Sequence, residues 1–186
     1  MSKGRLEAFS DAVLAVIITI MVLDIKAPDS NELKSLWHLW PKFLSYVLSF
    51  TYIAIYWNNH HHMMHAVNRV SGAVLWTNVH LLFWLSLVPF ATAWMSEHGS
   101  LWPVVVYGFV LLMAGIAYYF LAHCLVDIHG KDSDFAKALG NDWKGKVSVV
   151  IYIAAIALCF INPSIGFILY FLVAAMWFIP DRRFEK

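Results

Sequence analysis

The chain contains a series of long apolar segments, and this feature limits most strongly what it can fold into. A helix needs about 20 mainly apolar residues to cross the roughly 30 Å of a bilayer's hydrocarbon core. Six segments meet or approach that length: residues 6–25, 40–59, 70–94, 101–126, 147–161 and 164–179. Hydrophobic residues make up 61% of the 186 residues, and charged residues only 13%. A soluble domain this small could not bury so much apolar surface, so we predict an all-α integral membrane protein with six spans in one domain, residues 1–186.

The last two spans come from one apolar run, residues 147–179, which is 33 residues long. As a single helix it would measure about 50 Å at 1.5 Å per residue, which is too long for one span. The sequence Asn162-Pro163-Ser164 lies near its middle, and Asn-Pro favours a turn. We therefore expect two short spans here. A chain of five spans with a strongly tilted last helix is the alternative.

Charge and cysteine content exclude several other classes of protein. The net charge of +1 is too close to neutral to indicate a nucleic-acid partner. The two cysteines, Cys124 and Cys159, both lie inside apolar runs. Their number and position exclude a disulfide-linked secreted fold and a thiolate zinc site.

The basic residues are distributed unequally between the two sides that six spans define. One side, with both termini, holds ten of them, and the other side holds three. The ten are Lys3, Arg5, Arg69, Lys131, Lys137, Lys144, Lys146, Arg182, Arg183 and Lys186, and the three are Lys26, Lys34 and Lys42. Basic residues accumulate on the cytoplasmic side of membrane proteins. We therefore predict that both termini are cytoplasmic.

The first span carries a carboxylate, Asp11, and an apolar stripe. At 100° per residue, Val16, Ile20 and Leu23 fall within about 60° of one another, with Thr19 near them, and Asp11 lies about 140° from Val16. A charge inside a bilayer is expensive and needs partners. Asp11 is interpreted either as a structural carboxylate that faces the protein or as an ion ligand or proton carrier. The stripe is interpreted as packing, as lipid contact or as the lining of a pore.

Histidines are concentrated at the end of the second span, where residues 58–65 read Asn-Asn-His-His-His-Met-Met-His. His61 and His65 have the i, i+4 spacing that can share a metal ion. No carboxylate or cysteine lies within this stretch to complete a site. We expect hydrogen bonding near the interface and no metal. A metal or haem site and a pH-sensing role are the alternatives.

Several segments together resemble the family of the lysosomal potassium channel transmembrane protein 175 and its prokaryotic relatives. The first span reads Arg5-Leu-Glu-Ala-Phe9-Ser10-Asp11, which is similar to the family's Arg-x-x-x-Phe-Ser-Asp motif. Residues 57–61, Trp-Asn-Asn-His-His, resemble its second-helix pattern, Asn78 and Pro89-Phe90 its third-helix pattern, and residues 179–181 its ending.

This resemblance implies a channel that prefers potassium and forms a homotetramer, because prokaryotic members carry one six-helix repeat and assemble as four copies. It implies that the first helices line the pore and that rings at Val16, Ile20 and Leu23 form the constriction, with Thr19 beside the first ring. The family usually has Ile or Leu where this chain has Val16. The remaining matched residues would tie the first helix to its neighbours: Arg5, Phe9, Ser10 and Asp11, with Asn59, His60 and Asn78 as partners.

The resulting expectation is a passive potassium channel in a prokaryotic plasma membrane, with no enzymatic activity and no cofactor. No Thr-Val-Gly-Tyr-Gly sequence is present, so a filter built from backbone carbonyls is not encoded. The alternatives are a proton-coupled transporter that uses Asp11 and a histidine-ligated haem or metal membrane protein.

Overall fold

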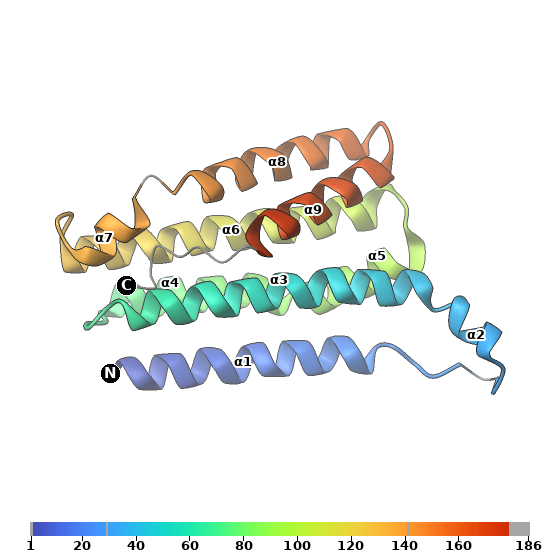
Figure 1. Cartoon of the computed structure of the whole chain (residues 1–186), viewed down its shortest axis with the longest axis horizontal. Coiled ribbons are helices and arrows are strands. Elements are labelled where there is room, and N and C mark those ends of the chain that lie inside the picture. The colour runs from blue at the N-terminus through green and yellow to red at the C-terminus, as the bar shows by residue number, and fades with distance from the viewer. Residues whose placement is uncertain (1, 29, 141, 179–186) are drawn as a thin grey trace.

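The computed structural model describes residues 2–28, 30–140 and 142–178, and Figure 1 shows their helices. The long ones are α1 (Lys3–Leu23), α3 (Trp40–His65), α4 (Gly72–Ser86), α5 (Val88–His98), α6 (Leu101–His129), α8 (Trp143–Cys159) and α9 (Pro163–Phe178). Two short ones, α2 (Leu33–Trp37) and α7 (Asp134–Leu139), lie in connecting segments. Two predictions fall outside the described residues: the family-like ending at residues 179–181, and the basic residues Arg182, Arg183 and Lys186.

The predicted third span, residues 70–94, is divided into two helices, α4 and α5. Ser71 caps the start of α4, where its side chain accepts a hydrogen bond from the backbone N–H of Val74. Pro89 lies in the first turn of α5 and has no N–H to donate to the carbonyl of Leu85. The helix is therefore interrupted at Leu87, and α5 continues to Gly99, which has a positive φ of 53°.

The segment between the predicted fourth and fifth spans, residues 127–146, contains less non-helical chain than those bounds imply. Helix α6 continues to His129, and α8 begins at Trp143. Between them, Ser133 caps α7 by accepting the N–H of Ala136. Phe135 and Leu139 of α7 are buried, so apolar contact with the bundle holds this turn in place. The apolar run after it forms two helices, α8 and α9, with the break at residues 160–162.

The helices form successive layers that begin with α1. Helix α1 contacts α3, α4 and α5, while α6 lies behind α4 and α5 and contacts α8 and α9. Helix α8 contacts α6 and α9 and is therefore far from α1 in the bundle. In Figure 1 α1 and α8 lie on opposite sides of the other helices.

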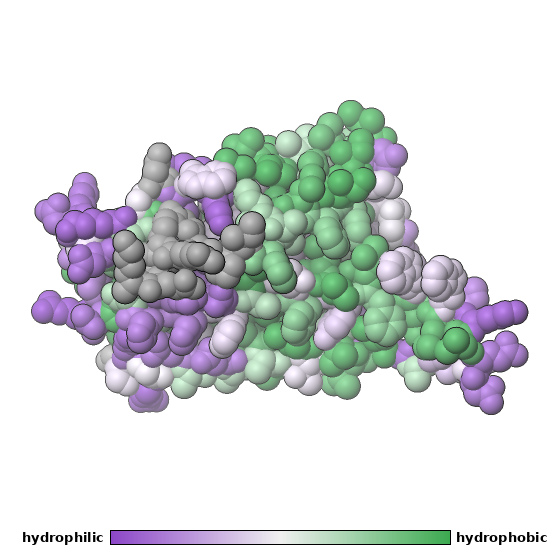
Figure 2. Space-filling model, viewed as in Figure 1, coloured by the Kyte–Doolittle hydropathy of each residue, from purple (hydrophilic) through white to green (hydrophobic). Residues whose placement is uncertain are grey.

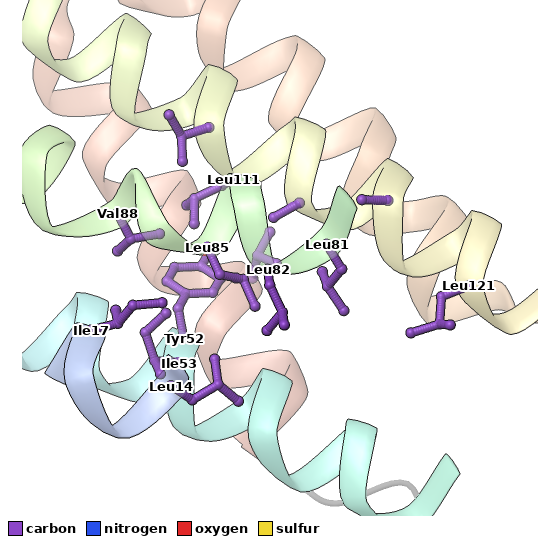
Figure 3. Close-up of a cluster of buried hydrophobic side chains, with 14 of the residues drawn as sticks. Leu14, Ile17, Tyr52, Ile53, Leu81, Leu82, Leu85, Val88, Leu111 and Leu121 are labelled. Carbon is purple, nitrogen blue, oxygen red and sulfur yellow. The ribbon is translucent and has the colours of Figure 1, made fainter. Parts of the chain in front are cut away.

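Apolar side chains from several helices fill the space between these layers. Figure 3 shows Leu14 and Ile17 of α1 beside Tyr52 and Ile53 of α3, with Leu85 of α4 close to them. All of these side chains are buried. One face of α1 is thus part of the core that the whole chain shares.

Polar groups in this core are paired, as they must be where no water is present. The Tyr52 hydroxyl donates to the carbonyl of Tyr170, and the Tyr170 hydroxyl donates to the carbonyl of Val104. Ser49 shares hydrogen bonds with Thr92 and Tyr107. In the part of the chain that the structure describes, no buried side-chain nitrogen or oxygen lacks a hydrogen-bond partner.

The surface has the pattern of a membrane protein. Figure 2 shows an apolar middle zone between polar side chains at the two ends of the bundle. By length and composition, three helical segments within the described ranges could cross a membrane: Lys3–Leu23, Gly72–His98 and Leu101–His129. Pro163–Phe178 is apolar but shorter. The N-terminus and α7 lie at one end of the bundle, and α2 lies at the other (Figure 1).

A close contact between α6 and α9 gives a first test of this packing. A Cβ atom added at Gly108 would overlap the ring and hydroxyl of Tyr170. Because that ring is buried and hydrogen-bonded, Gly108→Ala should displace it and destabilise the fold by about 1–3 kcal/mol. The melting temperature of the purified protein in detergent measures this effect.

Gly115→Ala on the same helix is the matched control. There the added atom meets only ordinary contacts, at 3.8 Å from the hydroxyl of Tyr56 and 3.9 Å from the ring of Tyr152. Its melting temperature should stay near that of the unaltered chain. Equal melting temperatures for the two variants would show that the contact at Tyr170 does not constrain the bundle.

Candidate functional site

Helix α1 has one face inside the subunit and a wide face outside it. The buried side chains recur every three or four residues: Leu6, Ser10, Leu14, Ile17 and Met21. This spacing places them on one side of the helix, against α3, α4 and α5. Much of the remaining surface of α1 is exposed in the subunit, and it contains the predicted stripe.

The stripe residues are among the most exposed apolar side chains of α1. Val16, Ile20 and Leu23 have exposed fractions of 57%, 51% and 73%. A row of branched apolar side chains left uncovered in a single subunit requires lipid, another protein surface or a narrow apolar passage beside it. Exposure alone does not separate these possibilities, because Val22, on another side of the helix, is also 45% exposed.

Ile18 and Val22, which the helical spacing places away from the stripe, have different surroundings. Ile18 is partly buried and packs against the core, whereas Val22 is exposed. The arc of α1 that the subunit leaves uncovered is therefore broader than the stripe itself. This breadth follows from the position of α1 at the outer edge of the bundle, where its own chain covers one side only.

Thr19 lies on the exposed part of α1 between the stripe residues. Its hydroxyl donates a hydrogen bond of 2.8 Å to the carbonyl of Ala15, one turn earlier on the helix. The hydroxyl proton is thereby directed to the backbone, and the oxygen lone pairs remain available as acceptors. Thr19 can therefore offer an oxygen ligand to a cation from an otherwise apolar surface.

A hydrogen-bonded chain of buried side chains ties α1 to α3 and α4. His60 bonds to the amide oxygen of Asn78 at 2.8 Å, and the amide nitrogen of Asn78 donates to Ser10 Oγ at 2.9 Å. Ser10 in turn donates to the carbonyl of Leu6. Because the oxygen of Asn78 can only accept, the His60 ring nitrogen that faces it must be the protonated one. All three side chains of this Ser10–Asn78–His60 network are buried.

Asp11 has a different environment from the one that the sequence indicates. Helical spacing points it toward the protein, but the structure leaves it exposed at the edge of the subunit. One carboxylate oxygen accepts a 3.0 Å hydrogen bond from the indole Nε1 of Trp57 on α3. Asp11 thus lies where the chain's own helices stop covering α1, and this bond links it to the motif on α3.

Trp57 was not predicted from the sequence as the hydrogen-bond partner of Asp11. It stands at the start of the Trp-Asn-Asn-His-His pattern, but tryptophans near span ends are usually interfacial anchors. Its single indole N–H is the signal that could have identified it, because a carboxylate within a membrane needs such a donor.

The other matched residues surround this network without joining it. Arg5 and Phe9 are exposed on α1. Asn59 is buried and donates to the carbonyl of Ile55 on its own helix, so it does not contact α1 through that bond. The start of α1 is held instead by Lys3, whose ammonium group donates to the carbonyl of Val67.

The histidine tract at the end of α3 forms a partly stacked row on the surface. The rings of Trp57 and His61 stack with centroids 6.0 Å apart, and those of His61 and His65 with centroids 6.2 Å apart. No group of three His, Cys, Asp or Glu side chains placed to hold a metal ion was found among the residues with described positions.

These features define an α-helical membrane protein whose first helix is covered mainly on one face by its own chain. Comparison with known proteins assigns the family. The profile described as endosomal/lysosomal potassium channel TMEM175 matches residues 5–89. The chain is 48% identical over 187 residues to a potassium channel of Chryseobacterium sp. (strain P1-3), covering 100% of this chain and 97% of that relative.

A solved structure and an animal relative agree with this assignment. The crystal structure of a lysosomal potassium-selective channel TMEM175 homolog from Chamaesiphon minutus superimposes with a TM-score of 0.81 and 31% identity, covering 96% of this chain and 97% of that chain. The human endosomal/lysosomal proton channel TMEM175 is 32% identical over 103 residues, which are 49% of this chain and 20% of the human protein.

The chain belongs to the TMEM175 potassium channel family. It is therefore a membrane channel and not an enzyme.

The Ser10–Asn78–His60 network gives a test of how α1 is attached. Asn78→Leu should leave the buried N–H of His60 without its acceptor, which costs about 1–3 kcal/mol, while Ser10 loses the bond from Asn78 but keeps its bond to the carbonyl of Leu6. We expect a clearly lower melting temperature and less folded protein. Thr77→Val is the control, because the Thr77 hydroxyl donates to carbonyls of its own helix, those of Ala73 and Val74, and is not part of the network. If both variants melt alike, the network does not hold α1 in place.

Proposed function

We propose that four copies of this chain assemble around an axis lined by their α1 helices and form a potassium-preferring cation channel in a prokaryotic plasma membrane. Each copy would contribute six spans: α1, α3, the α4–α5 pair, α6, α8 and α9. The single observation that carries the proposal is the uncovered face of α1, with Val16, Ile20 and Leu23 exposed by 57%, 51% and 73%. The names of the bacterial relatives support the choice of ion.

The constriction would consist of rings of apolar side chains from the four α1 helices. Val16, Ile20 and Leu23 occur at i, i+4 and i+7, and so they succeed one another along one side of the helix. Water and ions gain no hydrogen bonds at such a ring, so a narrow apolar passage blocks ions by losing its water. Opening must widen the ring or rotate it away from the axis.

Thr19 would supply the polar contact for an ion within this apolar passage. Its hydroxyl proton is directed to the carbonyl of Ala15, so its oxygen can face a cation as an acceptor. An ion that loses part of its hydration shell near the ring could replace a water by this oxygen. Potassium holds its water less tightly than sodium, so this exchange favours potassium.

The polar residues of the motif would position α1 without touching the ion. The Ser10–Asn78–His60 network joins the buried face of α1 to α3 and α4. The bond from Trp57 to Asp11 would hold the helix at a second point, about 100° further round α1. Two attachments on different sides of α1 would set its rotation, and the rotation decides which side chains face the axis.

The orientation in the membrane follows from the basic residues. At the end of the bundle that holds the start of α1 and the α6–α8 connection, the described chain has Lys3, Arg5, Lys131, Lys137 and other basic residues. The opposite end has Lys26, Lys34 and Lys42. The larger group would be cytoplasmic, as would both termini.

A second candidate function is proton permeation, because the animal relatives are named proton channels. Asp11 would be the carrier, since it is an exposed carboxylate on α1. Proton flux that Asp11→Asn abolishes, without potassium flux in the unaltered protein, would favour this function. Bound haem or metal in the purified protein would instead favour a histidine-ligated site.

Ile20→Asn tests the channel proposal directly. An amide in the ring gives water hydrogen-bonding partners, so the passage should stay wet. We expect a severalfold larger potassium flux into liposomes that contain the purified protein, together with a weaker preference for potassium over sodium.

Val22→Asn is the matched control, because Val22 is exposed like Ile20 but lies on another side of α1. It should leave both the flux and the ion preference near their original values. If Val22→Asn raised the flux while Ile20→Asn had no effect, α1 would face the axis with its other side and the proposed ring would be wrong.

A further inference from the structure

A cavity of about 480 Å³ lies between α3, α6, α8 and α9. Its walls are rich in tyrosine: Tyr52, Tyr56, Tyr118, Tyr119 and Tyr152. None of the residues around it belongs to α1, so it is separate from the proposed pore. Its size and its mainly apolar lining with a few polar groups are those of a ligand site.

The cavity extends from the middle of the bundle to one of its ends. On α3 its lining runs from Tyr52 to Asn59, and on α8 from Tyr152 back to Lys146. Each stretch is about 10 Å long at 1.5 Å per residue. The polar residues Asn59, Asp142 and Lys146 all lie at the end toward α7. A ligand here would have its apolar part in mid-membrane and its polar part at the interface.

The basic side chains at this polar end fit a phosphate. Lys146 lines the cavity, and the ammonium group of Lys144 lies 5.6 Å from the ring centre of Trp177, which also lines it. Among the described residues of the lining, Asp142 is the acidic one. With Lys146 in the lining and Lys144 over Trp177, the described side chains here include two lysines and one aspartate, and basic pockets at the cytoplasmic ends of membrane helices bind lipid headgroups.

The position of α8 indicates that the bilayer adjoins this cavity. Helix α8 contacts α6 and α9, in the layer farthest from α1. Its Val150 and Ile153 are 65% and 54% exposed, as suits contact with lipid. An assembly built around α1 therefore leaves this side to lipid and not to a second copy of the chain.

We propose that this cavity binds an anionic phospholipid of the cytoplasmic leaflet, with an acyl chain between the tyrosines and its phosphate at Lys146. The tyrosine rings supply the apolar contact, and Lys146 reaches the phosphate with its long side chain at the interface. Since α3 also carries His60 and Trp57, the lipid would contact the helix that holds α1 in place. That the cavity faces lipid of the cytoplasmic leaflet rests on the proposed assembly and orientation, whereas the binding measurement reports on the cavity alone.

Native mass spectrometry of the full chain in detergent tests the proposal, with dioleoylphosphatidylglycerol as the probe. The unaltered protein should retain this lipid. Gly115→Leu should reduce retention about fivefold or more, which corresponds to roughly 1 kcal/mol, because its side chain grows toward Tyr56 and Tyr152 and fills the cavity. Gly115→Ala, with only ordinary contacts, should retain the lipid.

Lys146→Gln tests the headgroup contact without altering the walls. It should weaken retention of the lipid, whereas Lys131→Gln, an exposed lysine outside the cavity at the same end, should not. Glycerol phosphate without acyl chains should not bind. Retention that is equal in Gly115→Leu and the unaltered chain, or no retained lipid in the unaltered chain, would overturn the proposal, and so would binding of glycerol phosphate alone.

Discussion

The attachment of α1 along one face determines how the rest of this structure can work. Leu6, Leu14, Ile17 and Met21 are buried against the bundle, while Val16 and the side chains near it are left exposed. A helix that is apolar all round would normally be covered all round by protein or by lipid. Here the subunit covers mainly one side, and the proposed channel would use the remaining surface to line its passage.

The rotation of α1 depends on hydrogen bonds that a membrane makes hard to replace. Ser10, Asn78 and His60 satisfy one another in the interior, and a lost partner there is not compensated by water. Trp57 adds a bond to Asp11 from a second direction. In the proposed channel these polar bonds would set the orientation of α1, while apolar contacts attach the helix to the bundle. Polar groups elsewhere in the core are paired in the same way, because the hydroxyls of Tyr52 and Tyr170 donate to carbonyls of neighbouring helices.

Much of this architecture could be predicted from the sequence, because long apolar segments in a bilayer have few alternatives to helices. Pro89 near the end of the third apolar segment was visible in the sequence. The division of that segment into α4 and α5, however, depends on one backbone hydrogen bond that Pro89 cannot donate. The helical period placed Val16, Ile20 and Leu23 on one side of α1, and they are exposed together.

The partners of individual side chains were harder to predict. Helical spacing oriented Asp11 toward the protein, but whether that side is covered depends on how far α3 extends around α1. The sequence also gave no sign of the cavity between α3, α6 and α8, because it arises from the distance between helices and not from any motif. Residues 5–89, which the family profile covers, include all of the predicted site, and the cavity lies partly outside them.

In the proposed channel Ile20, and not the adjacent exposed surface of α1, faces the ion pathway. Cadmium block of potassium current tests it in a chain whose own thiols, Cys124 and Cys159, have been replaced by Ser and Ala. Four thiolates around an axis bind a soft cation strongly. Ile20→Cys channels should be blocked by cadmium and recover with a chelator, while Val22→Cys channels should not be blocked. Block of Val22→Cys with none in Ile20→Cys would contradict it.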